Sequence, residues 1–275
     1  MPISTLRDQH VLITGGSSGI GLAIARQAAA AGARVSLVAR DPTRLTTARA
    51  AIQAASPGAA EVVTVPADVS VEAEILAALK TAEAVHGPVD VLVTSAGVAR
   101  PGYFDEVPVA VFERTMAVNY FGTLYPLKAV VPAMRQRNHG AVVIVASGAA
   151  LVGLFGYTPY APTKFALRGL AEALRAELKG TGVGITIVYP PDTDTPQLAE
   201  ENRTKPPETK ALTAAGGMWT ADAVAALTLA GVQQGRFAVT PGLPLTALAW
   251  WHSLLGPILR WHFDRVAAKA RAAAK

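Results

Sequence analysis

Three polar side chains between residues 147 and 164 have the types and the spacing needed to move a proton at a carbonyl group. Tyr160 and Lys164 are four positions apart, which places them on one face if the segment is helical. The positive charge of Lys164 favours the phenolate and is expected to lower the pKa of Tyr160 from its usual value of about 10. Ser147 directly follows the apolar run from Ala141 to Ala146. We expect it at the end of a buried strand, where its hydroxyl can hold a substrate oxygen.

A glycine-rich turn near the N-terminus supports this interpretation, because a Tyr-x-x-x-Lys pair alone would also suit an exposed helix. The apolar run from His10 to Thr14 predicts a strand, and the alanine-rich pattern from Leu22 to Ala31 predicts a helix. Between them, glycines spaced G-x-x-x-G-x-G direct backbone N–H groups and a helix N-terminus at a site for a pyrophosphate. The expected contacts with a dinucleotide are Gly15, Ser17, Ser18, Gly19, Ile20 and Gly21.

The end of the second predicted strand, Ala33 to Ala39, indicates which dinucleotide binds. A fold that binds NAD usually has an acid there for the ribose 2′-hydroxyl, whereas this chain has Arg40, whose guanidinium suits a 2′-phosphate. We interpret Asp41 as a helix N-cap because Pro42 follows it. Arg44 lies one turn into that helix, either near the same phosphate or as a solvated surface arginine. The expected cofactor is NADP(H).

Two further strands are predicted, Glu61 to Ala67 and Val89 to Thr94, with an amphipathic helix from Val71 to His86 between them. Strands rich in Val, Ile and Leu that alternate with helices favour an α/β fold of the Rossmann type, a doubly wound parallel sheet of about seven strands with helices on both faces. The carboxyl ends of such strands line the cofactor crevice. The expected contacts from these two ends are Asp68, Val69, Ala96 and Gly97.

Composition narrows the remaining classes of protein. The 275 residues suit one large α/β domain, expected over residues 1–240. The absence of cysteine excludes disulfides, thiolate metal sites and cysteine nucleophiles, and we predict no metal site. The first ten residues contain no long apolar segment of the kind that a signal peptide needs. We therefore expect a cytoplasmic protein.

The C-terminal extension, residues 241–275, differs from the rest of the chain. Residues 236–275 hold six Lys and Arg and one Asp, which accounts for the whole net charge of +5. The stretch from Pro241 to Leu259 has no charged side chain, and Trp250, Trp251 and Trp261 lie in or beside it. Tryptophan followed by cations is typical of a membrane interface. We expect a monotopic or re-entrant anchor rather than a span. Packing on the domain or on a partner subunit is the alternative.

Taken in order, these motifs resemble the short-chain dehydrogenase/reductase superfamily over residues 10 to about 240. Asn119 adds to the match, because it lies in MAVNYFG within a predicted helical region from Val109 to Asn138. The matching features are TGGSSGIG, the Asp68-Val69 pair, the Ser-Ala-Gly turn at 95–97, Asn119, Ser147 and the Tyr160/Lys164 pair.

The resemblance implies a catalytic tetrad of Asn119, Ser147, Tyr160 and Lys164. It implies that Tyr160 transfers the proton and that Lys164 lowers the pKa of that tyrosine and binds the nicotinamide ribose. Ser147 would orient the carbonyl group, and Asn119 would hold a water in a proton relay. By the same resemblance, Asp68 would contact the adenine.

Two segments are more closely similar to the 3-ketodihydrosphingosine reductases, which reduce the ketone of a long-chain amino ketone with NADPH in sphingolipid synthesis. They are LVGLFGYTPYAPTKFALRGLAEALRAEL at 151–178 and YPPDTDTPQLAEENRTKPPETK at 189–210. The resemblance implies that the backbone of Thr193 and the hydroxyl of Thr195 hold the nicotinamide end. It also implies a substrate lid within residues 190–219, formed by the polar stretch from Gln197 to Gly217. A connection with no direct role is the alternative.

The sequence thus predicts NADPH-dependent reduction of the 3-keto group of that amino ketone. A general ketoreductase acting on acyl-chain, steroid or xenobiotic ketones would have the same catalytic residues, whereas a non-catalytic dinucleotide sensor or a membrane-interaction protein would not need them. The expected partners are a long-chain keto-lipid substrate, the cytoplasmic face of a membrane and, from the resemblance, further copies of the chain in a homodimer or homotetramer. Nucleic-acid binding is disfavoured because the basic tail has no recognition motif.

Overall fold

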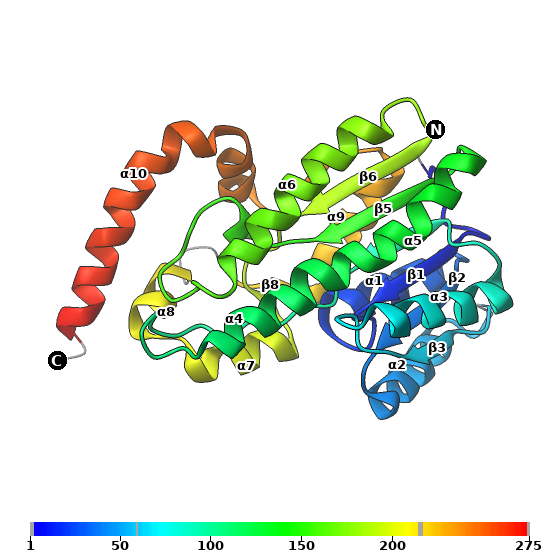
Figure 1. Ribbon diagram of the computed structural model, residues 1–275, viewed down its shortest axis with the longest axis horizontal. Helices are drawn as coiled ribbons and strands as arrows, with labels where there is room; N and C mark the ends of the chain where they lie inside the picture. The colour runs from blue at the N-terminus through cyan, green and yellow to red at the C-terminus, as the bar shows by residue number, and fades with distance from the viewer. Residues whose placement is uncertain (1–2, 59, 214–216, 274–275) are drawn as a thin grey trace.

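Seven strands of the described residues form one parallel sheet (Figure 1). The computed structural model describes residues 3–58, 60–213 and 217–273. The strands are β1 (His10–Thr14), β2 (Arg34–Ala39), β3 (Val63–Pro66), β4 (Val91–Thr94), β5 (Gly140–Val145), β6 (Val183–Val188) and β9 (Ala238–Val239). Their order is β3-β2-β1-β4-β5-β6-β9, which confirms the predicted doubly wound fold. The order reverses beside β1, and such a switch point opens a crevice at the carboxyl ends of the strands.

Helices cover both faces of the sheet, as predicted (Figure 1). One face packs against α1 (Gly19–Ala30), α2 (Pro42–Ala55) and α9 (Ala221–Gln233). The other packs against α3 (Glu72–His86), α5 (Gly122–Arg137) and α6 (Ala161–Leu178). Strand residues such as Ile13 and Leu92 are fully buried because both faces meet a helical layer. Asp41 caps α2 by accepting hydrogen bonds from two backbone N–H groups of its first turn, which confirms its predicted structural role.

The predicted helical region from Val109 to Asn138 is present but not uniform. It consists of α4 (Val109–Met116), one π-helical turn (Ala117–Phe121) and α5. The sequence did not predict this wider turn, which contains Asn119; such turns occur frequently at functional sites. The region ends at Asn138, whose backbone is left-handed with a φ of 50°, a conformation that asparagine tolerates at helix ends.

The predicted lid folds into short elements that follow β6. They are β7 (Thr193–Asp194), α7 (Pro196–Thr204), α8 (Pro207–Thr213) and β8 (Trp219–Thr220), and β7 pairs with β8 in parallel. Residues 214–216 of the predicted lid lie outside the described residues. The described part of the predicted lid therefore consists of short helices and strands, and its role as a lid stays a prediction.

The C-terminal extension forms α10 (Leu243–Ala273), two helical segments joined by a kink, and the second segment runs beside α8 (Figure 1). The bend occurs at Trp251, whose backbone is not helical (φ −121°, ψ 15°), and Pro257 lies within the helix without ending it. Residues 274–275 lie outside the described residues. Within the part that the structure describes, no helix is both long and apolar enough to cross a bilayer.

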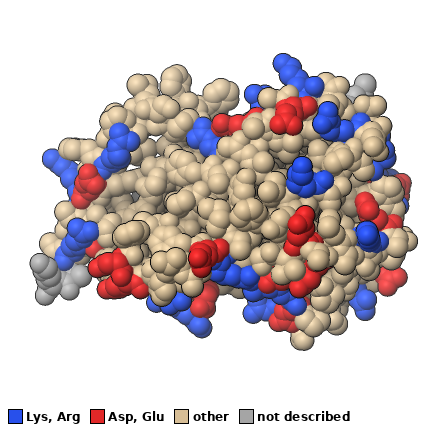
Figure 2. All heavy atoms as spheres, in the orientation of Figure 1, with Lys and Arg blue, Asp and Glu red and all other residues tan. Residues whose placement is uncertain are grey.

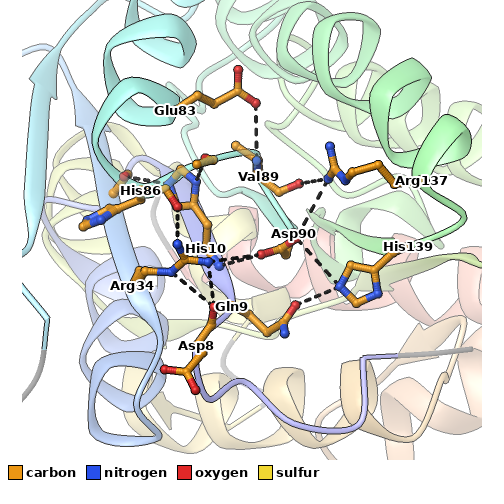
Figure 3. Close-up of polar contacts among 12 residues, drawn as sticks. Asp8, Gln9, His10, Arg34, Glu83, His86, Val89, Asp90, Arg137 and His139 are labelled. Atoms are coloured by element: carbon orange, nitrogen blue, oxygen red, sulfur yellow. Dashed lines mark hydrogen bonds and ion pairs between the residues drawn. The ribbon is translucent and has the colours of Figure 1, made fainter.

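A polar network fastens the opposite, amino-terminal edge of the sheet (Figure 3). His10 is fully buried at the start of β1, with Nδ1 2.7 Å from the carbonyl oxygen of Gly87 and Nε2 2.8 Å from Oγ of Ser36. Asp90 accepts a hydrogen bond of 2.9 Å from the backbone N–H of His10 and lies 3.9 Å from the guanidinium of Arg34. Burial lowers the pKa of His10 to about 4. The histidine is thus neutral at pH 7 and stabilises the fold at the edge remote from the crevice.

Candidate active site

One large cavity, about 1040 Å³ in volume, follows the carboxyl ends of the strands and continues between the lid and α10. Binding sites for drug-sized ligands measure about 300–1,000 Å³, so this cavity has room for an extended cofactor and a second molecule. The predicted site residues that line it are Gly15, Ser17, Ser18, Gly19, Ile20, Arg40, Arg44, Asp68, Val69, Ala96, Gly97, Ser147, Tyr160, Lys164, Thr193 and Thr195. Gly21 and Asn119 are buried behind its wall.

Ser147, Tyr160 and Lys164 open on the same part of this cavity. Tyr160 is the N-cap of α6, and Nζ of Lys164, one turn later, lies 5.4 Å from the centroid of its ring. The same ammonium donates a hydrogen bond of 3.2 Å to the carbonyl oxygen of Val145, at the end of β5. Ser147 follows β5 and accepts a hydrogen bond of 3.1 Å from the N–H of Ala149. The structure thus brings together the three groups that the sequence singled out first.

The pKa of Tyr160 is raised, which corrects the expectation that Lys164 lowers it. Burial is the largest cause and the carboxylate of Glu201 adds to it, whereas hydrogen bonding with the side chains of Ser147 and Gln197 acts in the opposite direction. Lys164 is itself buried, and burial lowers its pKa to about 8, so burial opposes both charged forms. At neutral pH Tyr160 is a protonated phenol, which is the form that donates a proton to a ketone.

Asn119 joins the loop after β4 to α6. Its Oδ1 accepts a hydrogen bond of 2.8 Å from the N–H of Val98, and its Nδ2 donates to the carbonyl oxygen of Val98 and to Oγ1 of Thr163, both at 3.0 Å. These three bonds use most of the capacity of the amide. Its side chain therefore positions the two segments on either side of it, and the relay water stays a prediction.

The glycine-rich turn fits the pyrophosphate of a dinucleotide. A Cβ on Gly15 would lie 2.6 Å from the backbone nitrogen of Ala96, and one on Gly21 would lie 2.5 Å from the carbonyl oxygen of Gly15, so only glycine allows these backbones to approach. Ser18 is the N-cap of α1 but makes no capping hydrogen bond with its side chain. The first N–H groups of α1 therefore remain open to an anion.

The end of β2 presents Arg40 to the cavity. Arg40 is exposed, and its guanidinium makes no ion pair with any residue that the structure describes. Arg44 also lines the cavity, but its Nε lies 3.7 Å from Oδ2 of Asp41. The more open cation for a 2′-phosphate is thus Arg40, while the alternatives for Arg44 remain open.

Asp68 follows β3 with its carboxylate already partnered. Oδ1 accepts a hydrogen bond of 2.7 Å from Oγ of Ser70, and Oδ2 accepts one of 2.8 Å from Nη2 of Arg114. Burial acts to raise the pKa of Asp68, but these hydrogen bonds outweigh it and lower that pKa to about 2. Asp68 is therefore an ionised acceptor tied to Arg114, a partner that the sequence did not predict.

Thr195 begins the first lid helix against the glycine-rich turn. Its Oγ1 accepts a hydrogen bond of 3.2 Å from the N–H of Leu198 and donates one of 3.1 Å to the carbonyl oxygen of Thr193. A Cβ on Gly19 would lie 3.0 Å from Cγ2 of Thr195. Both threonines are thus placed beside the cradle, and their contact with the nicotinamide stays a prediction.

Sequence reasoning did not assign Tyr157, Gln197 and Glu201 to the site, although they line the same cavity as Tyr160. Oε2 of Glu201 accepts a hydrogen bond of 2.8 Å from the Tyr157 hydroxyl, and Oε1 accepts one of 2.9 Å from Nε2 of Gln197. The ring centroids of Tyr157 and Tyr160 are 5.5 Å apart. The run AEENRTKP was the available signal, but it does not indicate which of its two glutamates is buried.

The comparison with protein families decides the chemistry of this site. A family model described as short chain dehydrogenase matches residues 9–206. The protein is a short-chain dehydrogenase. The 3-dehydrosphinganine reductase of Danio rerio is 44% identical over 239 residues, which are 86% of this chain and 72% of that protein. The 3-ketodihydrosphingosine reductase of Bos taurus is 44% identical over 230 residues, which are 83% of this chain and 69% of that protein.

Two solved structures share the fold. Levodione reductase superposes with a TM-score of 0.78 at 29% identity, covering 86% of this chain and 96% of that chain. A short-chain dehydrogenase/reductase from Burkholderia phymatum in complex with NAD superposes with a TM-score of 0.82 at 25% identity, covering 92% and 96%. This short-chain dehydrogenase is therefore an oxidoreductase acting between a ketone and an alcohol, with a nicotinamide dinucleotide as its cofactor.

Proposed function

We propose that this short-chain dehydrogenase reduces the 3-keto group of 3-ketodihydrosphingosine with NADPH in sphingolipid synthesis. The observation that carries the proposal is an apolar wall on the substrate side of the cavity. Its residues are Leu245, Leu248, Leu255, Leu259 and Phe263, which share the inner face of α10. Such a wall suits an alkyl chain better than a compact polar substrate. The names of the Danio rerio and Bos taurus relatives support the same substrate class.

The apolar wall begins beside the catalytic groups. Cδ2 of Leu245 would lie 3.0 Å from a Cβ built on Gly148, the residue that follows Ser147. A ketone held at Ser147 and Tyr160 therefore has space for its alkyl chain along α10. Each buried methylene contributes about 0.8 kcal/mol, so a long chain gains far more binding energy here than a short one.

The proposed catalytic roles follow from the positions of the side chains. The hydroxyl groups of Ser147 and Tyr160 bind the carbonyl oxygen of the substrate. When bound, the cofactor supplies the hydride that reaches the carbonyl carbon. The Tyr160 hydroxyl donates its proton to that oxygen as negative charge develops there. Lys164 stabilises the phenolate that remains and binds the nicotinamide ribose, and Asn119 positions α6 and holds the relay water.

NADPH is proposed over NADH because Arg40 is the open cation at the end of β2. An arginine fork binds a phosphate through two parallel charge-assisted hydrogen bonds, and the 2′-phosphate is the group that distinguishes the two cofactors. The glycine-rich turn would hold the pyrophosphate, Asp68 and Val69 would contact the adenine side, and Thr193 and Thr195 would contact the nicotinamide side.

The outer face of α10 supports association with a membrane surface. Trp250 is 79% exposed, and Leu254, Ile258 and Trp261 on the same side are also exposed. Figure 2 shows an uncharged surface over the bend of α10, with Lys and Arg side chains along its second half. Tryptophans and cations in this order match the interface of a bilayer. We propose peripheral binding to the cytoplasmic face, with α10 separating the membrane from the substrate cavity.

Exposed apolar residues on the helices around the catalytic groups support self-association. Phe121, just before α5, and Phe165, on α6, are both exposed. We propose that these faces pair subunits in a homodimer or homotetramer. Light scattering after size-exclusion chromatography tests this, and a monomer at micromolar concentration would contradict it.

In the first test of the proposed function, the purified protein is incubated with NADPH and 3-ketodihydrosphingosine in detergent, and oxidation of the cofactor is measured. A parallel panel contains acetoacetyl, steroid and simple aryl ketones. Fast oxidation with the sphingoid ketone alone is the expected result. Activity only on the other ketones would overturn the sphingoid assignment and leave a general ketoreductase.

A further inference from the structure

Glu201 is a buried acid beside the catalytic tyrosine. It is 7% exposed and lines the cavity. Both of its hydrogen-bond donors, the Tyr157 hydroxyl and the Gln197 amide, are neutral, and it forms no ion pair within the described part of the chain. Burying a carboxylate without a cation is unfavourable, and a negative charge in the last turn of α7 also opposes the helix dipole. The carboxylate of Glu201 is therefore suited to bind a cationic donor at short range.

A second acid in the same wall shows the contrast. Asp192 also lines the cavity, but its Oδ2 lies 3.2 Å from Nζ of Lys205, whose side chain is 1% exposed. Glu201 forms no such close ion pair among the described residues, and the buried ammonium of Lys164 in the same cavity acts on it only at longer range. A positively charged ligand group in the cavity would therefore be drawn to Glu201 rather than to Asp192.

Glu201 is also close to the point where the ketone is reduced. The side chain of Gln197 donates a hydrogen bond to Glu201 and lies close enough to Tyr160 to lower its pKa, so it neighbours both the carboxylate and the phenol. Tyr157, which donates to Glu201, packs against the ring of Tyr160. In 3-ketodihydrosphingosine the amino group is on the carbon next to the carbonyl carbon. A substrate whose carbonyl oxygen is held by Tyr160 can thus place its ammonium group beside Glu201.

We propose that Glu201 binds the 2-ammonium group of the substrate and thereby selects amino ketones over other long-chain ketones. This inference rests on the proposed function and identifies Glu201 as the residue that recognises the amino-bearing head group of the substrate. The ammonium takes the position on Glu201 that the Gln197 amide now occupies, which replaces a neutral donor by a charged one. Ser147 and Tyr160 hold the neighbouring carbonyl oxygen, and α10 holds the alkyl chain.

The test compares two substrates in wild type and in Glu201→Gln. One is 3-ketodihydrosphingosine, and the other is the same 1-hydroxy-3-ketone with hydrogen in place of the amino group. Glu201→Gln keeps a side chain of the same size but removes the negative charge, so we expect kcat/KM for the amino ketone to fall about 30-fold or more relative to the deamino ketone. Glu177→Gln makes the same charge change at an exposed position of α6 that does not line the cavity. We expect it to keep the wild-type ratio.

The ratio separates charge recognition from general damage, because a misplaced Tyr160 lowers both activities together. Parallel losses, or no loss, in Glu201→Gln would overturn the inference while leaving the proposed function intact. No activity of the wild type on 3-ketodihydrosphingosine would overturn both. If Glu201→Gln does not fold, inhibition of the wild type decides: a saturated primary amine should compete at least about tenfold better than the alcohol of the same chain length, and equal inhibition would reject the role of Glu201.

Discussion

Nε of Arg271, near the end of α10, lies 2.9 Å from Oε1 of Glu208 in α8. The side chain of Glu208 is 2% exposed and also accepts a hydrogen bond of 3.2 Å from the Tyr103 hydroxyl. The tail helix is thus fastened to the lid, while its inner face lines the substrate cavity. Deleting α10 would remove a wall of the cavity together with the proposed membrane contact, so substitutions on its two faces are needed to separate these roles.

Leu254 and Leu255 are neighbours on different faces of α10 and form a matched pair for this purpose. Leu255 lines the cavity, whereas Leu254 is exposed. We expect Leu255→Asp to raise KM for a long-chain ketone about tenfold or more without changing KM for a short ketone, because it removes apolar contact with the chain. We expect Leu254→Asp to leave both KM values in detergent unchanged and to reduce sedimentation with anionic liposomes.

Two other results would contradict these roles of Leu254 and Leu255. If Leu254→Asp binds liposomes as well as wild type does, the outer face of α10 is not the membrane contact. If Leu255→Asp impairs short and long ketones alike, the effect comes from damage to the site and not from the alkyl chain.

Tyr160→Phe removes the proposed proton donor and little else. We expect turnover in the reductive direction to fall by about 10²- to 10⁴-fold, with the Kd for NADPH, measured by fluorescence, nearly unchanged. Tyr125→Phe removes a tyrosine hydroxyl outside the cavity and should retain wild-type turnover. Because burial raises the pKa of Tyr160, the phenol stays protonated through neutral pH. The reductive kcat should therefore remain level there and decline only under alkaline conditions, and a decline centred below pH 7 would count against this assignment.

Arg40→Ala tests the preference between cofactors. Loss of a charge-assisted contact with the 2′-phosphate should raise KM for NADPH about tenfold or more, while KM for NADH stays near its wild-type value. Arg44→Ala is the matched comparison, because Arg44 lines the same cavity from the first turn of α2 and is paired with Asp41. A smaller rise of KM for NADPH in Arg44→Ala than in Arg40→Ala would identify Arg44 as a surface residue without a contact to the phosphate. A parallel rise of both KM values in Arg40→Ala would remove Arg40 from the phosphate site.

The sheet, the cradle and the grouping of Ser147, Tyr160 and Lys164 could be predicted because each depends on local sequence. A run such as His10 to Thr14 forms a strand wherever it is buried on both faces, and the four-residue spacing of Tyr160 and Lys164 fixes their common side. Position within the layered fold then follows from the alternation of strands and helices. No long-range contact is needed for these steps.

The features that the sequence did not predict depend on how the lid packs. Glu200 and Glu201 are adjacent and identical in type, and only the docking of α7 turns Glu201 toward Tyr160. That docking also buries the phenol of Tyr160 and brings the carboxylate of Glu201 near it, and both effects raise its pKa. The prediction of a lowered pKa, which considered Lys164 alone, was therefore wrong. The sequence likewise did not predict that one face of α10 lines the cavity, because the apolar residues of this segment are also typical of a membrane contact.

His10 provides a pH-dependent test of the far edge of the sheet. Burial lowers its pKa to about 4 in the folded chain, against about 6.5 when unfolded, so the unfolded state binds the proton more readily. The stabilisation by neutral His10 is complete above pH 6.5 and is lost as the pH falls from 6.5 to 4. The difference between the two pKa values corresponds to about 3 kcal/mol. We expect urea unfolding of His10→Gln to lose less free energy than wild type does between pH 7 and 4, by up to that amount. His262→Gln, at an exposed position of α10, should follow the wild-type curve. Equal pH dependence in His10→Gln and wild type would show that His10 does not titrate with unfolding.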